Sequence, residues 1–278
     1  MTCGRITVLV ENTAGGRGVL AEHGLSFWVE IGSRRILFDA GQTNVLLHNA
    51  HVLGIDLSTL DAIVLSHGHY DHVGGLQQIL DIAPSVPVYL HPQAIETKFA
   101  CSGKQAREIG MDRDAAQVLE QHIHNGLGSF TNARTEVFPG VWATGEIPRR
   151  SAFEDIGGRF YKDSDCTRPD ELSDDQALVL EVGNDLVVVL GCAHSGVINT
   201  LDHVAELFPG RPVRMLLGGM HLGSASHMRI AKTIETIRRY NVRRIGPAHC
   251  TGGQASRELW STLPERCFVC NTGTQIML

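Results

Sequence analysis

The sequence predicts an α/β (α+β) protein in which two β-sheets pack face to face and helices cover their outer faces. Short apolar runs rich in β-branched residues alternate with turn residues, both in the first third of the chain and in the last hundred residues. Each of these strand-rich halves also contains segments with helical spacing of apolar residues. The composition does not change abruptly between the halves, so we expect a single domain over residues 1–278.

The first half contains most of the predicted strands. The apolar segment 60–66 is nearly continuous, as is typical of a strand with both faces covered. Residues 74–83 carry apolar side chains at helical spacing. Strands are predicted at residues 5–11, 25–31, 34–41, 60–66 and 86–92, with a hairpin turning at 32–34.

The last hundred residues follow a similar plan. Residues 176–191 predict two antiparallel strands joined at the turn Gly183-Asn184-Asp185. Helices are predicted at 198–208 and 227–242, and further strands at 213–219 and 242–249.

The region between the halves, about residues 95–174, is less regular and rich in Gly, Arg, Asp and Asn. A helix is predicted near 113–123 and a short strand near 136–145. Long insertions in α/β enzymes often form lids or substrate walls, so we expect a substrate-covering insertion here. The alternative is a surface segment that has no function.

Composition and charge exclude several classes of protein. A formal charge of −6 argues against nonspecific binding to nucleic acid, which needs clustered Lys and Arg. No apolar run approaches the roughly 20 residues that cross a bilayer, and the first residues do not resemble a signal peptide. Seven cysteines are an odd number, so we expect reduced thiols and a cytoplasmic protein.

The stretch "SHGHYDH", residues 66–72, is the most informative in the chain. Along an extended segment, His67 and His69 point to the same side and can reach one metal ion. Asp71 and His72 follow where the chain turns and can reach a neighbouring ion. Crowded imidazoles lose solvation and repel one another when protonated, and a bound cation offsets both effects.

Three more predicted strands end in a histidine, at His194, His221 and His249. Loops at the carboxyl ends of strands form the sites of α/β proteins, so these histidines are expected at the same cleft. Asp39 also ends a strand, and we expect it to accept the second ring N–H of a ligating histidine. A turn-forming aspartate is the alternative. An ordinary, partly exposed polar role is expected for His23, His48, His51, His122, His124, His203 and His227.

The HxHxDH pattern before Gly74-Gly75, with "FDAG" upstream, resembles the metallo-β-lactamase-fold hydrolase superfamily. "GCAHSG", "GGMHL" and "PAHCTG" resemble a narrower branch, that of the archaeal synthase joining a dihydropterin to ribofuranosylaminobenzene phosphate. The resemblance implies a four-layer αββα sandwich of two mixed sheets. It also implies one or two divalent metal ions, with zinc expected and manganese or iron as alternatives.

Carried over by position, His67 and His69 match ligands of a first metal, and Asp71 and His72 match ligands of a second. His249 matches the C-terminal histidine ligand, and His194 stands near the middle histidine or the bridging aspartate. A bridging carboxylate is common in the superfamily, whereas this chain offers Cys192 or His194 there. Asp174 and Asp175 are candidates to compensate.

The predicted function is hydrolysis by a metal-activated hydroxide, on a small phosphoester or related ester. Asp71 would orient the water or take its proton, and His221 would protonate the leaving group. One alternative is the metal-dependent transferase reaction of the branch, and a second is a di-iron redox protein. Small, anionic substrates are the expected partners, with no nucleic acid and no membrane.

Overall fold

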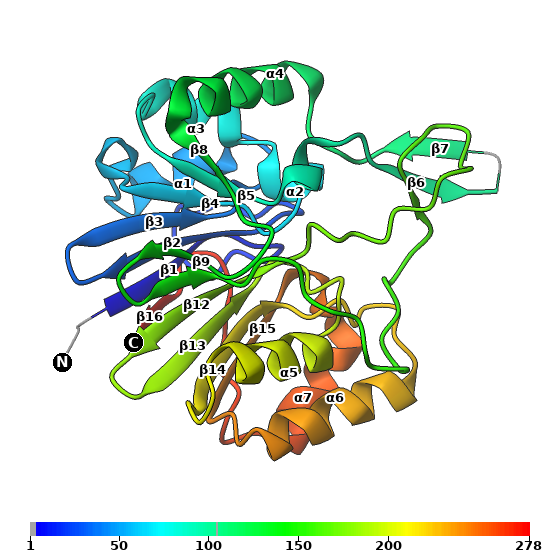
Figure 1. The fold of residues 1–278 in the computed structure, drawn as a ribbon. Helices are drawn as coiled ribbons and strands as arrows, with labels where there is room; N and C mark the ends of the chain where they lie inside the picture. Colours follow the sequence, from blue (N-terminus) through cyan, green and yellow to red (C-terminus); the bar gives the residue numbers. More distant parts are fainter. Residues whose placement is uncertain (1–3, 104) are drawn as a thin grey trace.

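Two mixed β-sheets lie face to face, and helices cover the outer face of each sheet (Figure 1). The structure is a computed structural model that describes residues 4–103 and 105–278. The four-layer α/β architecture that the sequence predicts is confirmed, and most strands of each sheet come from one strand-rich half of the chain.

The first sheet has seven strands in the order β16-β1-β2-β3-β4-β5-β8. They are β1 (Gly4–Val10), β2 (Ser26–Ile31), β3 (Arg34–Phe38), β4 (Ala62–Val64), β5 (Val88–Leu90), β8 (Gly128–Phe130) and β16 (Gln275–Met277). The predicted hairpin is confirmed, since β2 pairs antiparallel with β3. From β3 to β8 the strands run parallel, so the loops after β3, β4 and β5 leave the same edge.

The second sheet has six strands in the order β15-β14-β13-β12-β10-β9. They are β9 (Thr135–Phe138), β10 (Val141–Ala143), β12 (Ala177–Val182), β13 (Asp185–Leu190), β14 (Val213–Gly219) and β15 (Arg244–Ala248). The predicted hairpin of β12 and β13 is confirmed. Strands β13, β14 and β15 are parallel, so the loops with His194, His221 and His249 leave one edge together.

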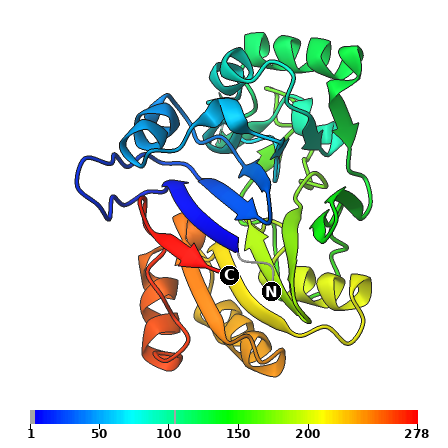
Figure 2. The ribbon, with the colours of Figure 1, turned by 90° about the vertical axis from the view of Figure 1, so that its left-hand side faces the viewer.

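Helices form the outer layers (Figures 1 and 2). The first sheet is covered by α1 (Val45–Val52), α3 (Leu76–Ile82) and α4 (Arg113–His122). The second is covered by α5 (Val197–Leu207), α6 (His227–Arg239) and α7 (Gly253–Thr262). Shorter turns are α2 (Tyr70–Val73), η1 (Leu57–Thr59), η2 (Pro92–Ile95), η3 (Ile123–Leu127) and η4 (His249–Thr251). Among the described residues, none of the helices combines the length and the apolar character that a membrane span requires.

Three apolar clusters hold the layers together. The central one lies between the sheets and includes Phe27, Phe38 and Val187, all fully buried. The position of β4 explains why its sequence is continuously apolar. Ala62 and Val64 belong to this central cluster, whereas Ile63 belongs to the cluster under α1, α3 and α4. Both faces of the strand are therefore out of contact with water.

Part of the region between the two halves projects from the sandwich at β6 and β7, whereas the rest of it joins the main layers (Figure 1). Its small sheet has the order β11-β6-β7, from β6 (Phe99–Ser102), β7 (Gln105–Glu108) and β11 (Phe160–Tyr161). The helix and strand predicted within it correspond to α4 and to the β9–β10 pair.

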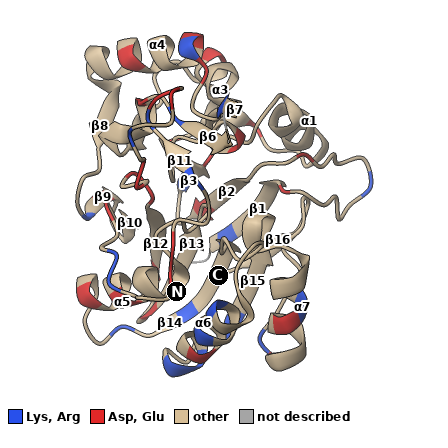
Figure 3. Cartoon of the chain, turned by 90° about the vertical axis from the view of Figure 1, so that its right-hand side faces the viewer, with Lys and Arg blue, Asp and Glu red and all other residues tan. Residues whose placement is uncertain are grey.

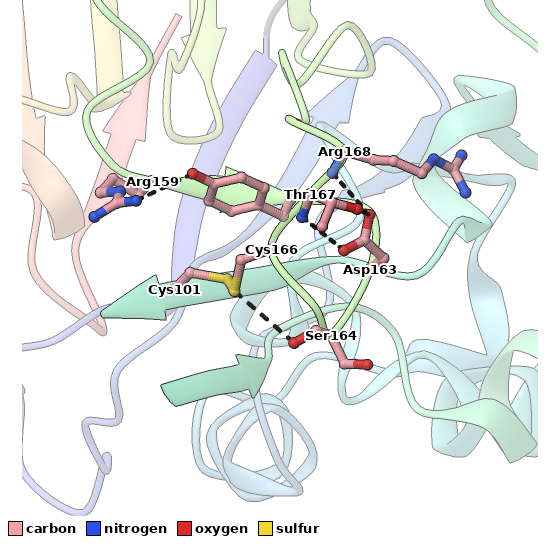
Figure 4. Close-up of a disulfide and its surroundings, with 8 residues drawn as sticks. Cys101, Arg159, Asp163, Ser164, Cys166, Thr167 and Arg168 are labelled. Atoms are coloured by element: carbon pink, nitrogen blue, oxygen red, sulfur yellow. Dashed lines mark hydrogen bonds between the residues drawn. A yellow bond between two sulfur atoms is a disulfide. The ribbon is translucent and has the colours of Figure 1, made fainter. Parts of the chain in front are cut away.

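The expectation that every cysteine is a free thiol is wrong. Cys101 on β6 forms a disulfide with Cys166, in the loop that follows β11 (Figure 4). The two residues are 65 positions apart in sequence, so an odd cysteine count could not reveal that folding brings them together. Free thiols are found at Cys192, Cys250, Cys267 and Cys270, and Cys3 lies outside the described residues.

Candidate metal centre

The loops that follow β4, β13, β14 and β15 surround one cavity of about 160 Å³. His67 and His72 are fully buried behind its wall. Its lining includes His69, Asp71, Cys192, His194, His221 and His249. The structure therefore brings the six candidate metal ligands and His221 to one place, from two sheets.

Two glycines allow the crowded first loop to form. A Cβ atom at Gly68 would lie 2.1 Å from the carbonyl oxygen of Ala94, and one at Gly74 would lie 2.1 Å from that of Gln42. No side chain fits at either position, so the backbone can approach its neighbours and hold the histidines rigidly.

The first group of nitrogen atoms comes from His67, His69 and His194. His67 Nε2 lies 3.0 Å from His69 Nδ1, and His194 Nε2 lies 3.2 Å from the same atom. Cys192 offers its Sγ within 4.8 Å of the ligand atoms of His67 and His194.

The second group comes from Asp71, His72 and His249. The Nε2 atoms of the two histidines are 3.3 Å apart. Asp71 Oδ2 lies 3.3 Å from His249 Nε2 and 3.9 Å from His72 Nε2. Cys192 Sγ is 3.2 Å from His72 Nε2, so this thiol adjoins the second group as well.

Hydrogen bonds behind the second group fix the tautomers of its histidines. His72 Nδ1 donates to Asp39 Oδ2 at 2.7 Å, and His249 Nδ1 donates to Asn12 Oδ1 at 2.9 Å. A carboxylate and an amide oxygen only accept, so the Nδ1 atom of each ring carries a proton and the Nε2 atom of each ring faces the cavity. Two nitrogen lone pairs at 3.3 Å would repel each other, so a proton or a metal ion must lie between these Nε2 atoms.

The first group has the same arrangement. Ser66 Oγ donates to Asp39 Oδ2 at 2.7 Å and accepts from His67 Nδ1 at 2.9 Å. His194 Nδ1 donates to the carbonyl oxygen of Ile156 at 3.2 Å. The Nε2 atoms of His67 and His194 are again left as acceptors. Buried imidazole lone pairs that converge with a carboxylate and a thiol are the donor set of a zinc site, so the residues present fit a divalent ion.

The electrostatics of the cluster also favour a cation. Burial lowers the pKa of His69 to about 3, and burial together with the neighbouring imidazoles lowers the pKa of His67 and His194 well below the usual range. Burial opposes the charge on His72, but Asp39 and Asp71 outweigh it and raise its pKa to about 9. Burial likewise opposes charge on Asp71, but His72, His23 and His249 lower its pKa well below its usual range.

His221 lies beside the first group rather than within it. Its ring centroid is 4.2 Å from that of His194, its Nε2 is 3.4 Å from the carbonyl oxygen of Gly157, and its buried Nδ1 has no partner. Burial lowers the pKa of His221, but its contact with the Cys250 thiol outweighs burial and raises it overall.

Sequence reasoning missed several residues of the site. His23 was expected to be an ordinary polar residue, yet its Nε2 lies 3.2 Å from Asp71 Oδ2. Glu11 and Asn12, at the end of β1, hold His249 through its backbone N–H at 2.7 Å and its ring at 2.9 Å. No motif marks these three residues, because each is distant in sequence from the histidine loops.

Asp174 and Asp175 do not replace the bridging carboxylate. Asp174 Oδ2 accepts from the N–H of Gly68 at 2.8 Å, and Asp174 Oδ1 accepts from Lys98 Nζ at 2.9 Å. Asp175 Oδ2 accepts from the N–H of Ser195 at 2.7 Å. Both carboxylates support the backbone of the histidine loops, and neither lines the cavity.

The mouth of the cavity combines aromatic and basic side chains. Tyr70, Arg107 and Phe160 line it, and the Arg107 guanidinium lies 5.6 Å from the centre of the Tyr70 ring.

A larger hollow of about 460 Å³ between the loop 150–153 and helices α5 and α6 contains none of the histidines of the metal centre. The chemistry points to the smaller cavity, because among the residues that the structure describes the metal-ligating atoms converge there.

Several known proteins resemble this chain in sequence or in fold. The sequence model of the metallo-beta-lactamase superfamily matches residues 20–197. A 7,8-dihydropterin-6-methyl-4-(beta-D-ribofuranosyl)-aminobenzene-5'-phosphate synthase of Methanocaldococcus jannaschii is 30% identical over 264 residues, which cover 90% of this chain and 88% of the synthase. A hydroxyacylglutathione hydrolase of Pectobacterium atrosepticum is 23% identical over 183 residues, covering 65% of this chain and 64% of the hydrolase.

Among solved structures, Tm1679, described as a metal-dependent hydrolase of the beta-lactamase superfamily, superimposes with a TM-score of 0.83. It is 30% identical, and the match covers 99% of both chains. The family match spans more than half of the chain and includes the HxHxDH loop. The chain belongs to the metallo-beta-lactamase superfamily.

Proposed function

We propose that this protein is a metal-dependent hydrolase that acts on a small phosphoester or a related ester. The observation that carries the proposal is the pair of converging donor groups beside one open cavity. In this proposal His67, His69 and His194 hold one divalent ion, and Asp71, His72 and His249 hold another, with zinc expected and manganese or iron as alternatives. A bound divalent ion supplies Lewis acidity and makes water acidic enough to react near neutral pH.

The protein's own groups then handle protons and position the reactants. Asp71 lines the cavity and accepts from His23, which reaches solvent, so this pair can carry a proton out of the site. His221 lines the same cavity and its unpartnered Nδ1 is available to protonate a leaving group. Asp39 and Asn12 keep the Nε2 atoms of His72 and His249 directed at the cavity.

Substrate selection is proposed to lie at the mouth of the cavity. Ala100, Arg107 and Phe160 come from the insertion at about 95–174 and line the cavity together with the histidines. A guanidinium next to aromatic rings favours an anionic substrate with a flat or apolar group. This is the substrate-covering role that we propose for the insertion.

A second candidate is the synthase reaction that joins a dihydropterin to ribofuranosylaminobenzene phosphate. The relative with that name matches 90% of this chain, and this coverage is the observation that favours it. Both candidates use an anionic substrate and a metal centre, so the reaction must be distinguished by product analysis.

The experiment compares metal-free protein with protein reloaded with zinc, manganese or iron. We expect metal-dependent turnover of bis-p-nitrophenyl phosphate or of an aryl ester by the wild type. Turnover is expected to fall at least 100-fold, about 2.7 kcal/mol in barrier, in the His67→Ala/His69→Ala double variant and in His249→Ala. His124→Ala, at an exposed histidine outside the site, is the matched control and should behave as wild type.

Equal turnover with and without metal would contradict the proposal, as would wild-type activity in the double variant. A metal-loaded protein that hydrolyses none of these esters but condenses a dihydropterin with ribofuranosylaminobenzene phosphate would establish the second candidate instead.

We propose small molecules, and not nucleic acid or membrane, as partners. Figure 3 shows acidic and basic residues interspersed over the outer helices rather than separated into one basic face, and the net charge is −6. Cytoplasmic localisation stays a prediction from sequence, and the Cys101–Cys166 disulfide does not support it, because such bonds form mostly in oxidising compartments.

A further inference from the structure

One side chain belongs to both donor groups of the cavity. Cys192 lies just beyond β13 and is 4% exposed. Its Sγ falls within 4.8 Å of the ligand atoms of His67 and His194 on one side, and of His72 and His249 on the other. A ligand shared between two metal ions must occupy such a position.

The carboxylates near this position are engaged elsewhere. Asp174 and Asp175 accept backbone N–H groups of Gly68 and Ser195. Asp71 groups with His23 and His249, on the second side only. In the described residues, the atom that faces both groups is therefore a sulfur rather than a carboxylate oxygen.

The hydrogen bonds around Cys192 leave its sulfur free for a cation. Its contact at 3.2 Å is with His72 Nε2, the cavity-facing nitrogen of a ring whose Nδ1 proton is held by Asp39. A neighbouring thiol, Cys250, points its Sγ at the carbonyl oxygen of Cys192 at 3.5 Å and also lies beside the Cys192 thiol and His221. Cys250 groups only with Cys192 and His221, at the cavity's edge.

We propose that Cys192 is a bridging thiolate ligand, whose Sγ is shared between the ion held by His67, His69 and His194 and the ion held by Asp71, His72 and His249. This inference rests on the metal centre proposed above and deepens it. On metal binding the thiol proton is released to solvent, since the thiolate is the ligand. A sulfur bridge favours zinc or another soft or borderline ion over manganese and magnesium, which prefer oxygen ligands.

The test is a titration of metal-free protein with cobalt(II), without reductant, followed by absorption in the near ultraviolet. For the wild type we expect two equivalents of cobalt and a sulfur-to-cobalt charge-transfer band. Cys192→Ser should lose the band and bind the second equivalent more than about tenfold more weakly, because even the loss of a partner behind a ligand has that effect. Cys192→Asp should restore the two-ion stoichiometry without the band.

Two matched cysteine variants serve as controls. Cys250→Ser tests the adjacent thiol, and Cys267→Ser tests a free thiol outside the cavity. Both should keep the band. If Cys192→Ser does not fold, X-ray absorption of zinc-loaded wild type and Cys250→Ser gives the same information, with a sulfur shell at about 2.3 Å expected in both.

The outcomes separate this inference from the proposed function. A wild type that takes up cobalt without a sulfur band, or a band that survives in Cys192→Ser, overturns the thiolate bridge and leaves the histidine metal centre standing. A band lost in Cys250→Ser alone also overturns it. A folded wild type that takes up no metal overturns the metal centre itself.

Discussion

Asp39 connects three parts of the cavity wall through one carboxylate. Its Oδ1 accepts from the N–H of Ser66, and its Oδ2 accepts from both Ser66 Oγ and His72 Nδ1, each at 2.7 Å. It is fully buried and has φ of 62°, a left-handed backbone conformation. Its hydrogen bonds decide which nitrogen of His72 faces the cavity.

Replacing this aspartate should weaken metal binding without removing a ligand. In Asp39→Asn the amide nitrogen would donate to His72 Nδ1, so the ring proton would move to Nε2 and block the lone pair. We expect zinc affinity to fall about 10- to 100-fold, measured by competition with a chromophoric chelator.

The control for this variant is Asp81→Asn, at an exposed position on α3. Unchanged zinc affinity in Asp39→Asn would show that its hydrogen bond does not set the tautomer of His72.

Helix α5 supports the loop that carries His194, and its first turn depends on a distant residue. Its N-cap is Gly196, which offers no side chain, and Glu154 accepts from the N–H groups of Ile198 and Asn199, both at 2.8 Å. A carboxylate at a helix N-terminus also interacts favourably with the helix dipole. Burial nevertheless raises the pKa of Glu154 above its ordinary value of 4.5, because it outweighs these two hydrogen bonds.

The raised pKa predicts how stability depends on pH. The pKa of Glu154 is higher in the folded protein than in the unfolded chain. Its contribution to folding stability is therefore fully present below pH 4.5 and is lost as pH rises through the folded-state pKa of Glu154. Glu154→Gln lacks this titration and loses one hydrogen bond, about 1 kcal/mol. The stability advantage of wild type over Glu154→Gln should therefore shrink as pH rises from acidic to neutral.

Chemical denaturation of both proteins across that pH range provides the measurement. Glu120→Gln, on the exposed side of α4, should show a constant difference from wild type. An advantage of wild type over Glu154→Gln that grows with pH would contradict this account of the cap.

At the scale of the whole molecule, the candidate ligands join the two sheets. His67, His69 and His72 follow β4 of the first sheet, whereas His194 and His249 follow β13 and β15 of the second. A bound ion would therefore cross-link the two sheets at one end of the sandwich, and its binding energy would stabilise the fold.

Removing metal should consequently lower the melting temperature of the entire chain. At a free zinc concentration 100 times Kd, binding adds about 2.7 kcal/mol of stability. This corresponds to a shift in melting temperature of roughly 5 to 10 °C, measured with and without a chelator. The His67→Ala/His69→Ala variant should lose most of the shift, whereas His124→Ala should keep it. Equal melting temperatures of wild type with and without chelator would contradict the prediction.

The pattern of local elements could be predicted well from sequence. The hairpins β2–β3 and β12–β13, and the helices α4, α5 and α6, follow from turn residues and apolar periodicity within short segments. β16 was not predicted, because its pairing with β1 depends on the return of the chain's end to the first sheet's edge. The pairing of Cys101 with Cys166 was missed for the same reason.

Order and spacing along the chain are enough to show that imidazoles and a carboxylate crowd into residues 67–72 and that three more histidines follow apolar strands, since these are local properties of the sequence. How these side chains divide into two groups depends on the packing of the sheets. The tertiary structure places His194 with the first group and Cys192 between both, assigns Asp174 and Asp175 to backbone support, and brings His23 to Asp71. Distances of about 3 Å between residues far apart in sequence depend on how the sheets pack, which no single segment encodes.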